Sequence, residues 1–315
     1  MATPPPKGGT PPFGNPVSIF GKMKGQKGCL PGRVALVMLA CMGWLKLIGF
    51  LLGAYALFVL LVALLQTPLL FPRWAMGAPP PLPAGAERLE LERPGGVVLH
   101  GQIVRAEGGE GRPLLLGFGG NAWDAVSLLR YMRDVLPGHN VASFHFRGYS
   151  PSTGRPSASA LLEDALAVHD HLQAEFGPHS VLAVGFSIGS GPAAHLAARR
   201  DLAGAVLVTP FASLTDVARG HYPWLPVRWL FRHPMAPAED LAGSDLPLAL
   251  IWAARDAVVP ARHARALAEA LAGNEPGVVF AQEIDADHND IYGRADFQAV
   301  LREAVARVEA VAAGR

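Results

Sequence analysis

Apolar and polar positions follow different patterns in the two parts of this chain. Residues 47–65 carry no charge and are almost wholly apolar, and the apolar character continues as far as Phe71. From about residue 88 onward, short apolar runs of strand length alternate with segments in which apolar positions recur at helical spacing. Alternation of this kind predicts an α/β fold, with helices on both faces of a mostly parallel sheet.

The α/β part opens with a predicted antiparallel hairpin, residues 88–91 and 97–104, around Pro94-Gly95-Gly96. Further strands are expected at residues 113–118, 141–146, 181–186, 205–209, 246–252 and 278–284. Helices are expected at residues 125–136, 157–176, 261–271 and 296–313. These elements predict one domain over residues 87–315, with a short cap at about 212–240.

The apolar segment predicts a single transmembrane helix. The 19 residues from Leu47 to Leu65 span about 29 Å as a helix, close to the thickness of a bilayer's hydrocarbon core. We therefore expect a membrane anchor at residues 33–71, with its core span at about 47–70. A cleaved signal peptide is the alternative; the apolar run is long for one, and no small-x-small cleavage site follows Leu65.

The segments on either side of the anchor have biased compositions. Residues 1–32 are rich in Pro, Gly and Lys, and we expect a disordered basic segment. Residues 72–86 contain a proline run, which predicts a stiff linker between the anchor and the domain.

Charge is distributed unevenly along the chain. Seven of the 27 Lys and Arg residues, and none of the 26 Asp and Glu residues, precede residue 87. Six of these seven bases precede Leu47, so the positive-inside rule predicts a cytoplasmic N-terminus and an α/β domain on the other side of the membrane.

Composition also limits the classes of function. The acidic balance after residue 86 and the lack of lysine after Lys46 argue against a nucleic-acid partner. The two cysteines, Cys29 and Cys41, precede the domain, which therefore has neither a disulfide nor a thiolate ligand to offer. We expect no metal and no cofactor.

The most informative motif is Gly185-Phe186-Ser187-Ile188-Gly189, at a predicted strand-to-helix junction. A serine between two glycines at such a junction is typical of the nucleophile elbow of α/β-hydrolases. Small neighbours let the strand and the helix approach tightly enough to expose the serine in a strained conformation. Ser187 is the candidate nucleophile, and the amide of Ile188 is a candidate oxyanion donor.

A serine nucleophile needs a general base, and the base needs an orienting acid. In this fold the three follow in the order serine, acid, histidine, each after a strand. Asp256 follows the strand at 246–252, and His288 follows the strand at 278–284. An ordinary turn aspartate is the alternative role for Asp256. His145, which ends the strand at 141–146, is the rival to His288, although it precedes the serine in the chain.

Two further loops are expected to border the site. The segment Gly117-Phe118-Gly119-Gly120-Asn121 follows a strand, and glycines let backbone amides turn toward a substrate carbonyl. The amide of Asn121 is the second candidate oxyanion donor, with Gly120 as the alternative. The loop at 146–154 is expected to shape the rim of the pocket.

In the segment from His221 to Arg232, two prolines break the chain into short pieces, and aromatic residues alternate with basic ones. It is expected to form the cap over the active site. Two roles are equally compatible with this segment. It forms either a lid that admits acyl chains or touches the membrane interface, or a packed cap without a lipid role.

With these motifs in place, the chain resembles the membrane-anchored α/β-hydrolases of the serine aminopeptidase and monoacylglycerol-lipase-like group, in particular the Bem-like branch. The resemblance covers about residues 60–310. It rests on residues 66–72, 120–122, 146–150, 185–191, 256–260 and 288–290. Two departures are Gly119, where the family usually has histidine, and Ala253, where it usually has glycine.

The resemblance implies a cofactor-free serine hydrolase that cleaves ester, thioester or amide bonds through Ser187, His288 and Asp256. Related members act on lipids, acyl-proteins and small esters, so a small acyl substrate is expected. The alternatives are a catalytically silent hydrolase fold that binds a partner or lipid, and an acyltransferase that uses the same residues.

Overall fold

The computed structural model describes Met1, residues 31–178 and residues 180–315. The N-terminal segment predicted to be disordered falls almost wholly outside these residues. The chain divides into two compact units, Met1–Leu57 and Phe58–Arg315, and the second contains the whole α/β fold.

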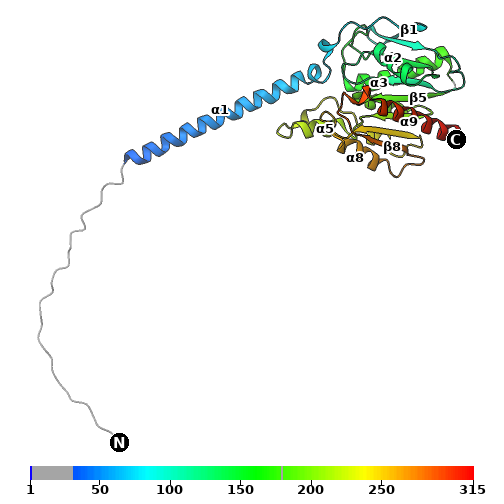
Figure 1. The fold of residues 1–315 in the computed structure, drawn as a ribbon. Helices are drawn as coiled ribbons and strands as arrows, with labels where there is room; N and C mark the ends of the chain where they lie inside the picture. The colour runs from blue at the N-terminus through cyan, green and yellow to red at the C-terminus, as the bar shows by residue number, and fades with distance from the viewer. Residues whose placement is uncertain (2–30, 179) are drawn as a thin grey trace, which may run out of the picture. The chain divides into compact units, whose positions relative to one another are not determined.

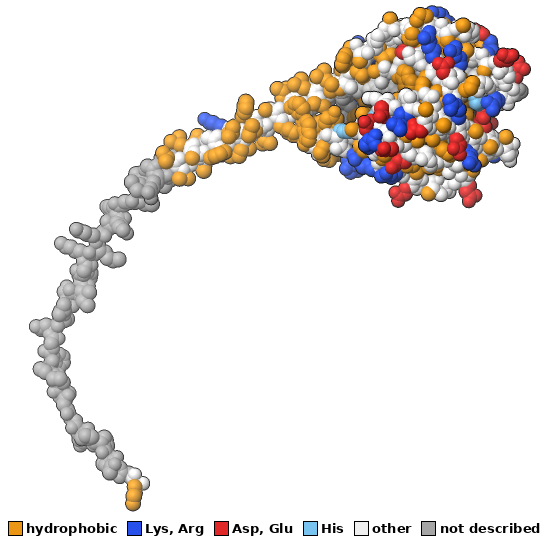
Figure 2. Space-filling view, viewed as in Figure 1, with side chains coloured by type: hydrophobic (Ala, Val, Ile, Leu, Met, Phe, Trp, Pro, Cys, Tyr) orange, Lys and Arg blue, Asp and Glu red, His pale blue; other side chains and the backbone are white. Residues whose placement is uncertain are grey.

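Helix α1 (Pro31–Leu70) has 40 residues and is long and apolar enough to cross a membrane. From Leu36 to Phe58 its side chains are exposed, and Figure 2 shows hydrophobic side chains along its length. Among the described residues it is the one helix with these properties, in agreement with the single transmembrane helix predicted from the sequence. A short turn of 3-10 helix, Arg73–Ala75, follows it.

A sheet forms the centre of the second unit (Figure 1). It has eight strands in the order β1-β2-β4-β3-β5-β6-β7-β8. The hairpin of β1 (Ala86–Arg93) and β2 (Val97–Val104) is antiparallel, and β2 pairs antiparallel with β4 (Val141–Phe144). All other pairs are parallel. The remaining strands are β3 (Leu114–Phe118), β5 (Val181–Phe186), β6 (Gly204–Val208), β7 (Leu248–Ala253) and β8 (Val278–Ile284).

Helices cover both faces of this sheet. Helices α2 (Ala125–Val135) and α9 (Ala295–Ala313) pack on one face. The opposite face is covered by α3 (Ala158–Phe176), α4 (Ser190–Ala197) and α8 (Arg262–Ala270). The predicted class, a mostly parallel sheet between two layers of helices, is confirmed. Between β6 and β7 the chain forms three short helices, α5 (Leu214–His221), α6 (Val227–Leu230) and α7 (Pro237–Asp240), in the region expected to be the cap.

The central strand β5 has no polar face because both of its faces pack against apolar clusters. Val181 and Ala183 belong to the apolar cluster under α3 and α4, whereas Leu182, Val184 and Phe186 belong to the cluster under α2 and α9. All six residues of the strand are buried, because a parallel strand covered on both faces has no solvent side.

Strand β4 ends two residues earlier than predicted from the sequence. The amide of His145 still donates to His100 O, at 2.9 Å, but the chain then turns, and the amide of Gly148 donates to Thr153 O at 2.9 Å. The side chains of Ser152 and Thr153 accept hydrogen bonds from the amides of β2, so the loop after β4 is fixed to the neighbouring strand.

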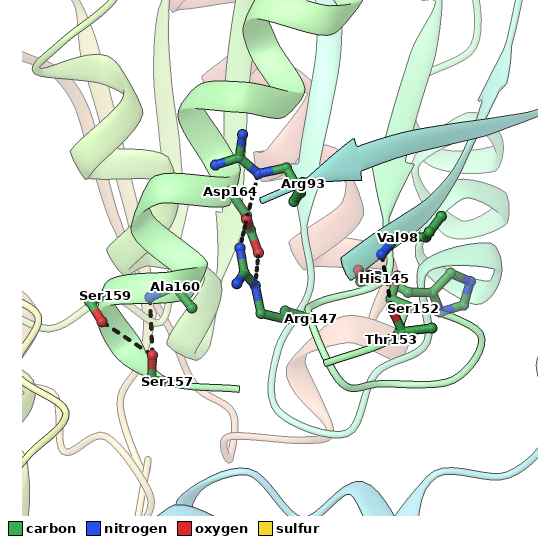
Figure 3. A network of polar contacts seen from close by, with 10 residues as sticks. All are labelled: Arg93, Val98, His145, Arg147, Ser152, Thr153, Ser157, Ser159, Ala160 and Asp164. Carbon is green, nitrogen blue, oxygen red and sulfur yellow. Dashed lines mark hydrogen bonds and ion pairs between the residues drawn. The ribbon is translucent and has the colours of Figure 1, made fainter. Parts of the chain in front are cut away.

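A buried ion cluster fixes the start of the same loop (Figure 3). Asp164 on α3 accepts hydrogen bonds from Arg93 Nε on β1, at 3.1 Å, and from Arg147 Nε in the loop, at 2.8 Å. Its side chain is 9% exposed, and the two arginines are 21% and 17% exposed. The hydrogen bond to Asp164 raises the pKa of Arg147 above its usual value. The cluster therefore joins α3, β1 and the loop after β4.

Removing the carboxylate of this cluster is expected to destabilise the protein strongly. Asp164→Ala leaves two largely buried guanidinium groups without their partner, which costs about 3 kcal/mol and lowers the melting temperature by roughly 6–12 °C. Thermal unfolding of the detergent-solubilised protein measures the change. Asp216→Ala is the matched control, because Asp216 and its partner Arg219 are 53% and 58% exposed and their pair contributes little. Equal shifts in the two variants would contradict the structural role of Asp164.

Candidate active site

Ser187 lies at the junction of β5 and α4, in a turn of 3-10 helix, Ser187–Gly189. Its φ is 52°, a left-handed conformation that residues with a side chain rarely adopt. The side chain is held in a buried position at the carboxyl end of the sheet, and the residue is 7% exposed.

The two flanking glycines make this conformation possible. A Cβ atom on Gly185 would lie 2.6 Å from Gly189 O and 2.7 Å from the Cβ atom of Ala193. A Cβ atom on Gly189 would collide with the carbonyl oxygens of Phe118 and Gly119 at the end of β3. Any larger residue at either position would push β5, α4 and β3 apart, so the tight turn requires glycine.

His288 lies beside Ser187, although 101 residues separate them in the chain. The Ser187 Oγ and His288 Nε2 atoms are 2.9 Å apart, and His288 is 8% exposed. His288 follows β8, and the parallel arrangement of β5, β6, β7 and β8 brings the ends of these strands to one edge of the sheet.

Asp256 completes the chain of hydrogen bonds. Its Oδ2 atom is 2.6 Å from His288 Nδ1, and its Oδ1 atom accepts from the amides of Val258 and Val259 at 2.8 and 2.6 Å. The Asp256 side chain is 1% exposed. Because a carboxylate oxygen accepts the hydrogen bond from His288 Nδ1, the ring proton lies on Nδ1, which leaves Nε2 as an acceptor for the serine hydroxyl.

The other histidine weighed from the sequence, His145, is 4% exposed, and burial lowers its pKa to about 4. No hydrogen bond between the described residues joins its ring to Ser187. The arrangement therefore favours His288 over His145 as the partner of the serine.

The loop after β3 passes directly over Ser187. A Cβ atom on Gly120 would lie 3.6 Å from the Cβ atom of Ser187, so the backbone of this loop is close to the nucleophile position. The side chain of Asn121 is tied at both ends: Nδ2 donates to Leu70 O at 2.7 Å, and Oδ1 accepts from the Tyr149 hydroxyl at 2.9 Å. Burial raises the pKa of Tyr149 and keeps its hydroxyl protonated as the donor.

Aromatic rings pack beneath the same loop. Trp123 contacts Tyr131, Phe186 and Tyr292, with ring centroids 5.5, 5.3 and 5.1 Å away. Burial, together with the nearby charge of Asp256, raises the pKa of Tyr292 to about 12. The Tyr292 hydroxyl lies 3.2 Å from Thr209 Oγ1 at the end of β6. This packing supports the elbow strand from the side of α2 and α9.

Sequence reasoning missed the polar residues at the end of α1. Gln66 and Thr67 contact the cap region, and the carbonyl of Leu70 receives the Asn121 side chain. The one sign of these residues in the sequence is that Gln66 and Thr67 interrupt the apolar run. Within residues 31–178 and 180–315, no group of three or more His, Cys, Asp or Glu side chains could hold a metal ion.

Comparison with known proteins relates this geometry to a family. A family model described as the alpha/beta hydrolase fold matches residues 114–244. An uncharacterized protein of Mycobacterium tuberculosis is 34% identical over 232 residues, which cover 70% of this chain and 79% of that protein. The lysophosphatidylserine lipase ABHD12 of Rattus norvegicus is 27% identical over 227 residues; the match covers 62% of this chain and 56% of the lipase.

Among solved structures, the esterase Pf2001 of Pyrococcus furiosus has a TM-score of 0.57 at 20% identity. The match covers 72% of this chain and 97% of the esterase, and at this identity it shows a shared fold. The resemblance to α/β-hydrolases drawn from the sequence motifs is thus confirmed. The chain belongs to the alpha/beta-hydrolase family.

Proposed function

We propose that this protein is a serine hydrolase that cleaves an acyl ester bond. The observation that carries the proposal is the continuous hydrogen-bonded chain Ser187–His288–Asp256, with distances of 2.9 and 2.6 Å and all three side chains buried. A protein that only binds a partner has no use for a strained serine, an imidazole nitrogen that accepts from its hydroxyl, and a buried carboxylate that orients the imidazole.

In the first half of the proposed reaction, Ser187 Oγ attacks the carbonyl carbon of the substrate. His288 Nε2 takes the serine proton as the new C–O bond forms, and Asp256 stabilises the resulting imidazolium. The tetrahedral oxyanion accepts hydrogen bonds from the amides of Ile188 and Asn121. His288 then gives its proton to the leaving alcohol, the bond to the alcohol breaks, and an acyl-serine remains.

In the second half, His288 removes a proton from a water molecule that attacks the acyl-serine. Collapse of the second tetrahedral intermediate breaks the bond to Ser187, which regains its proton from His288, and the carboxylic acid leaves. Every step is an acid–base or acyl transfer, so the reaction needs no cofactor. An alcohol in place of the water would make the same site an acyltransferase.

The proposed substrate is an acyl lipid at a membrane. A lipase and an esterase are among the similar proteins, which supports an acyl substrate. The cap carries Tyr222, Trp224 and Trp229, which are 50%, 53% and 82% exposed, interleaved with Arg228 and Arg232. Exposed aromatic and basic side chains are typical of segments at the membrane interface.

The anchor supports the same location for the enzyme. Helix α1 is long and apolar enough to span a bilayer, and the bases before Leu47 favour a cytoplasmic N-terminus. We propose a single-pass protein whose catalytic unit lies on the non-cytoplasmic side.

The nucleophile is tested with a fluorophosphonate probe, which labels only activated serines. Wild-type protein should be labelled, and Ser187→Ala should lose the labelling together with at least about a thousand-fold of the esterase rate. Ser190→Ala is the matched control, because Ser190 is also buried and lies three residues further on, outside the hydrogen-bonded chain. Labelling that survives in Ser187→Ala would rule out this nucleophile, and folded wild-type protein without labelling would favour the silent binding fold.

The lipid role of the cap is tested with esters of different chain length. The double variant Trp224→Ala, Trp229→Ala should lose at least about tenfold more kcat/KM on dodecanoyl esters than on acetate esters. The reason is that an indole side chain buried against an acyl chain is worth about 1.5–3 kcal/mol. Hydrolysis is measured with both esters in the same micelles, and the acetate ester is the internal control. Equal losses on both esters would support a packed cap without a lipid role.

The orientation is tested with reporters fused after Gly77. A phosphatase that is active only outside the cytoplasm should be active in this fusion, whereas a reporter that works only in the cytoplasm should be silent. The same two reporters fused before Met1 should give the opposite result. Cytoplasmic activity of the fusion after Gly77 would reverse the proposed topology.

A further inference from the structure

The last part of α1, residues 58–70, lies within the compact catalytic unit and buries one face of the helix. The buried or half-buried positions recur at helical spacing, and the residues between them are exposed. The inward positions are Val59, Val62, Ala63, Gln66, Thr67 and Leu70. The outward positions include Leu60, Leu61, Leu64, Leu65 and Leu69. One face of this helix is therefore apolar and exposed, and the other contacts the rest of the unit.

Gln66 joins this helix to the cap through both ends of its carboxamide. Its Nε2 atom donates to Leu230 O at 3.1 Å, and its Oε1 atom accepts from the amide of Arg232 at 2.7 Å. The side chain is 9% exposed. A carboxamide is the group that can satisfy one backbone carbonyl and one backbone amide together, so neither leucine nor glutamate can replace it.

Thr67 forms a second link, through His233. The Thr67 Oγ1 atom lies 2.8 Å from His233 Nε2, and His233 Nδ1 accepts from the amide of Ala158 at the start of α3, at 3.4 Å. Burial lowers the pKa of His233 and favours the neutral ring. A neutral ring that accepts at Nδ1 carries its proton on Nε2, so it donates to the threonine hydroxyl.

Phe71, directly after the helix, reaches the wall of the active site. It is 2% exposed and packs in one apolar cluster with Ile188, Tyr149 and Phe211. Its ring meets the His233 ring edge to face, with centroids 5.2 Å apart. Phe71 is therefore in the same packed cluster as Ile188, whose amide is one of the two proposed oxyanion donors.

The other proposed donor is tied to the helix directly. Asn121 donates from Nδ2 to Leu70 O, and the carbonyls of the last turn of a helix have no partner within the helix. The second bond of the Asn121 side chain, from the Tyr149 hydroxyl, leaves the carboxamide with both ends held. No hydrogen bond between the described residues uses the backbone N–H of Asn121, which leaves it available to an oxyanion.

We propose that the inward-facing residues at the end of the anchor helix, Gln66, Thr67, Leu70 and Phe71, form a positioning element of the active site. It orients the peptide plane of Asn121 and supports Ile188, so the positions of both oxyanion donors depend on how this segment packs against the enzyme. The inference rests on the proposed hydrolase function. Small displacements of a donor matter because its hydrogen bond must meet the oxyanion at about 2.7–3.1 Å.

The test uses the full-length enzyme in detergent micelles with a short soluble ester. Gln66→Leu and Asn121→Ala should each lower kcat about tenfold, with little change in KM, because the donors act on the transition state. Asn121→Ala keeps the backbone amide and removes only the tether to Leu70 and Tyr149. Leu69→Ala is the matched control, because this side chain belongs to the same turn and is 66% exposed.

Titration with the fluorophosphonate probe counts the folded active sites, so kcat is expressed per labelled serine. A tenfold loss per labelled serine in both variants, with the control within about twofold of wild type, supports the positioning role. Wild-type kcat per labelled serine overturns it, even where the total activity falls because fewer molecules fold. An equal loss in Leu69→Ala also overturns it. If instead the wild-type enzyme neither labels nor hydrolyses esters, the proposed hydrolase function fails before this inference is reached.

Discussion

The left-handed backbone of Ser187 is the constraint on which the rest of the site depends. Residues with a side chain rarely adopt a φ of 52°, and the conformation persists here because the surrounding structure enforces it. Glycines at 185 and 189 allow β5, β3 and α4 to approach within a distance that excludes any Cβ atom. The turn thereby aims the serine side chain at His288 and places the amide of Ile188 at the start of a helix.

The parallel sheet brings residues that are distant in the chain together in one site. Asn121, Asp256 and His288 follow β3, β7 and β8, and each of these strands ends at the same edge as β5. Strands β3, β5 and β6 are buried on both faces, so a shift of one residue would exchange their side chains between the two apolar clusters and disrupt the packing. The precision of the hydrogen-bonded chain is therefore a consequence of core packing several residues away.

The sequence predicted those parts of the site that follow a strand. Ser187 directly follows a predicted strand, and Asp256 and His288 each lie four residues beyond one, so the strand pattern predicted that they lie at one edge of the sheet. The contacts of Gln66 and Thr67 were beyond such reasoning. Their partners in the cap lie 164 to 166 residues away, and two of them are backbone groups that leave no trace in the sequence. The early end of β4 was missed for the same reason, because the Ser152 and Thr153 contacts that fix the loop join positions 52 and 55 residues apart.

A helix that both anchors a protein and supports its active site must suit two environments, the bilayer on one face and the packed protein on the other. In residues 58–70 the outward positions are apolar, as a bilayer requires, while the inward face carries Gln66 and Thr67. Polar side chains in a lipid environment are costly unless their hydrogen bonds are satisfied, and here the cap and His233 satisfy them. The same bonds that make these two residues tolerable at the membrane also fix the helix to the enzyme. Anchoring and positioning are therefore one set of interactions, and a change that loosens the helix from the cap acts on both.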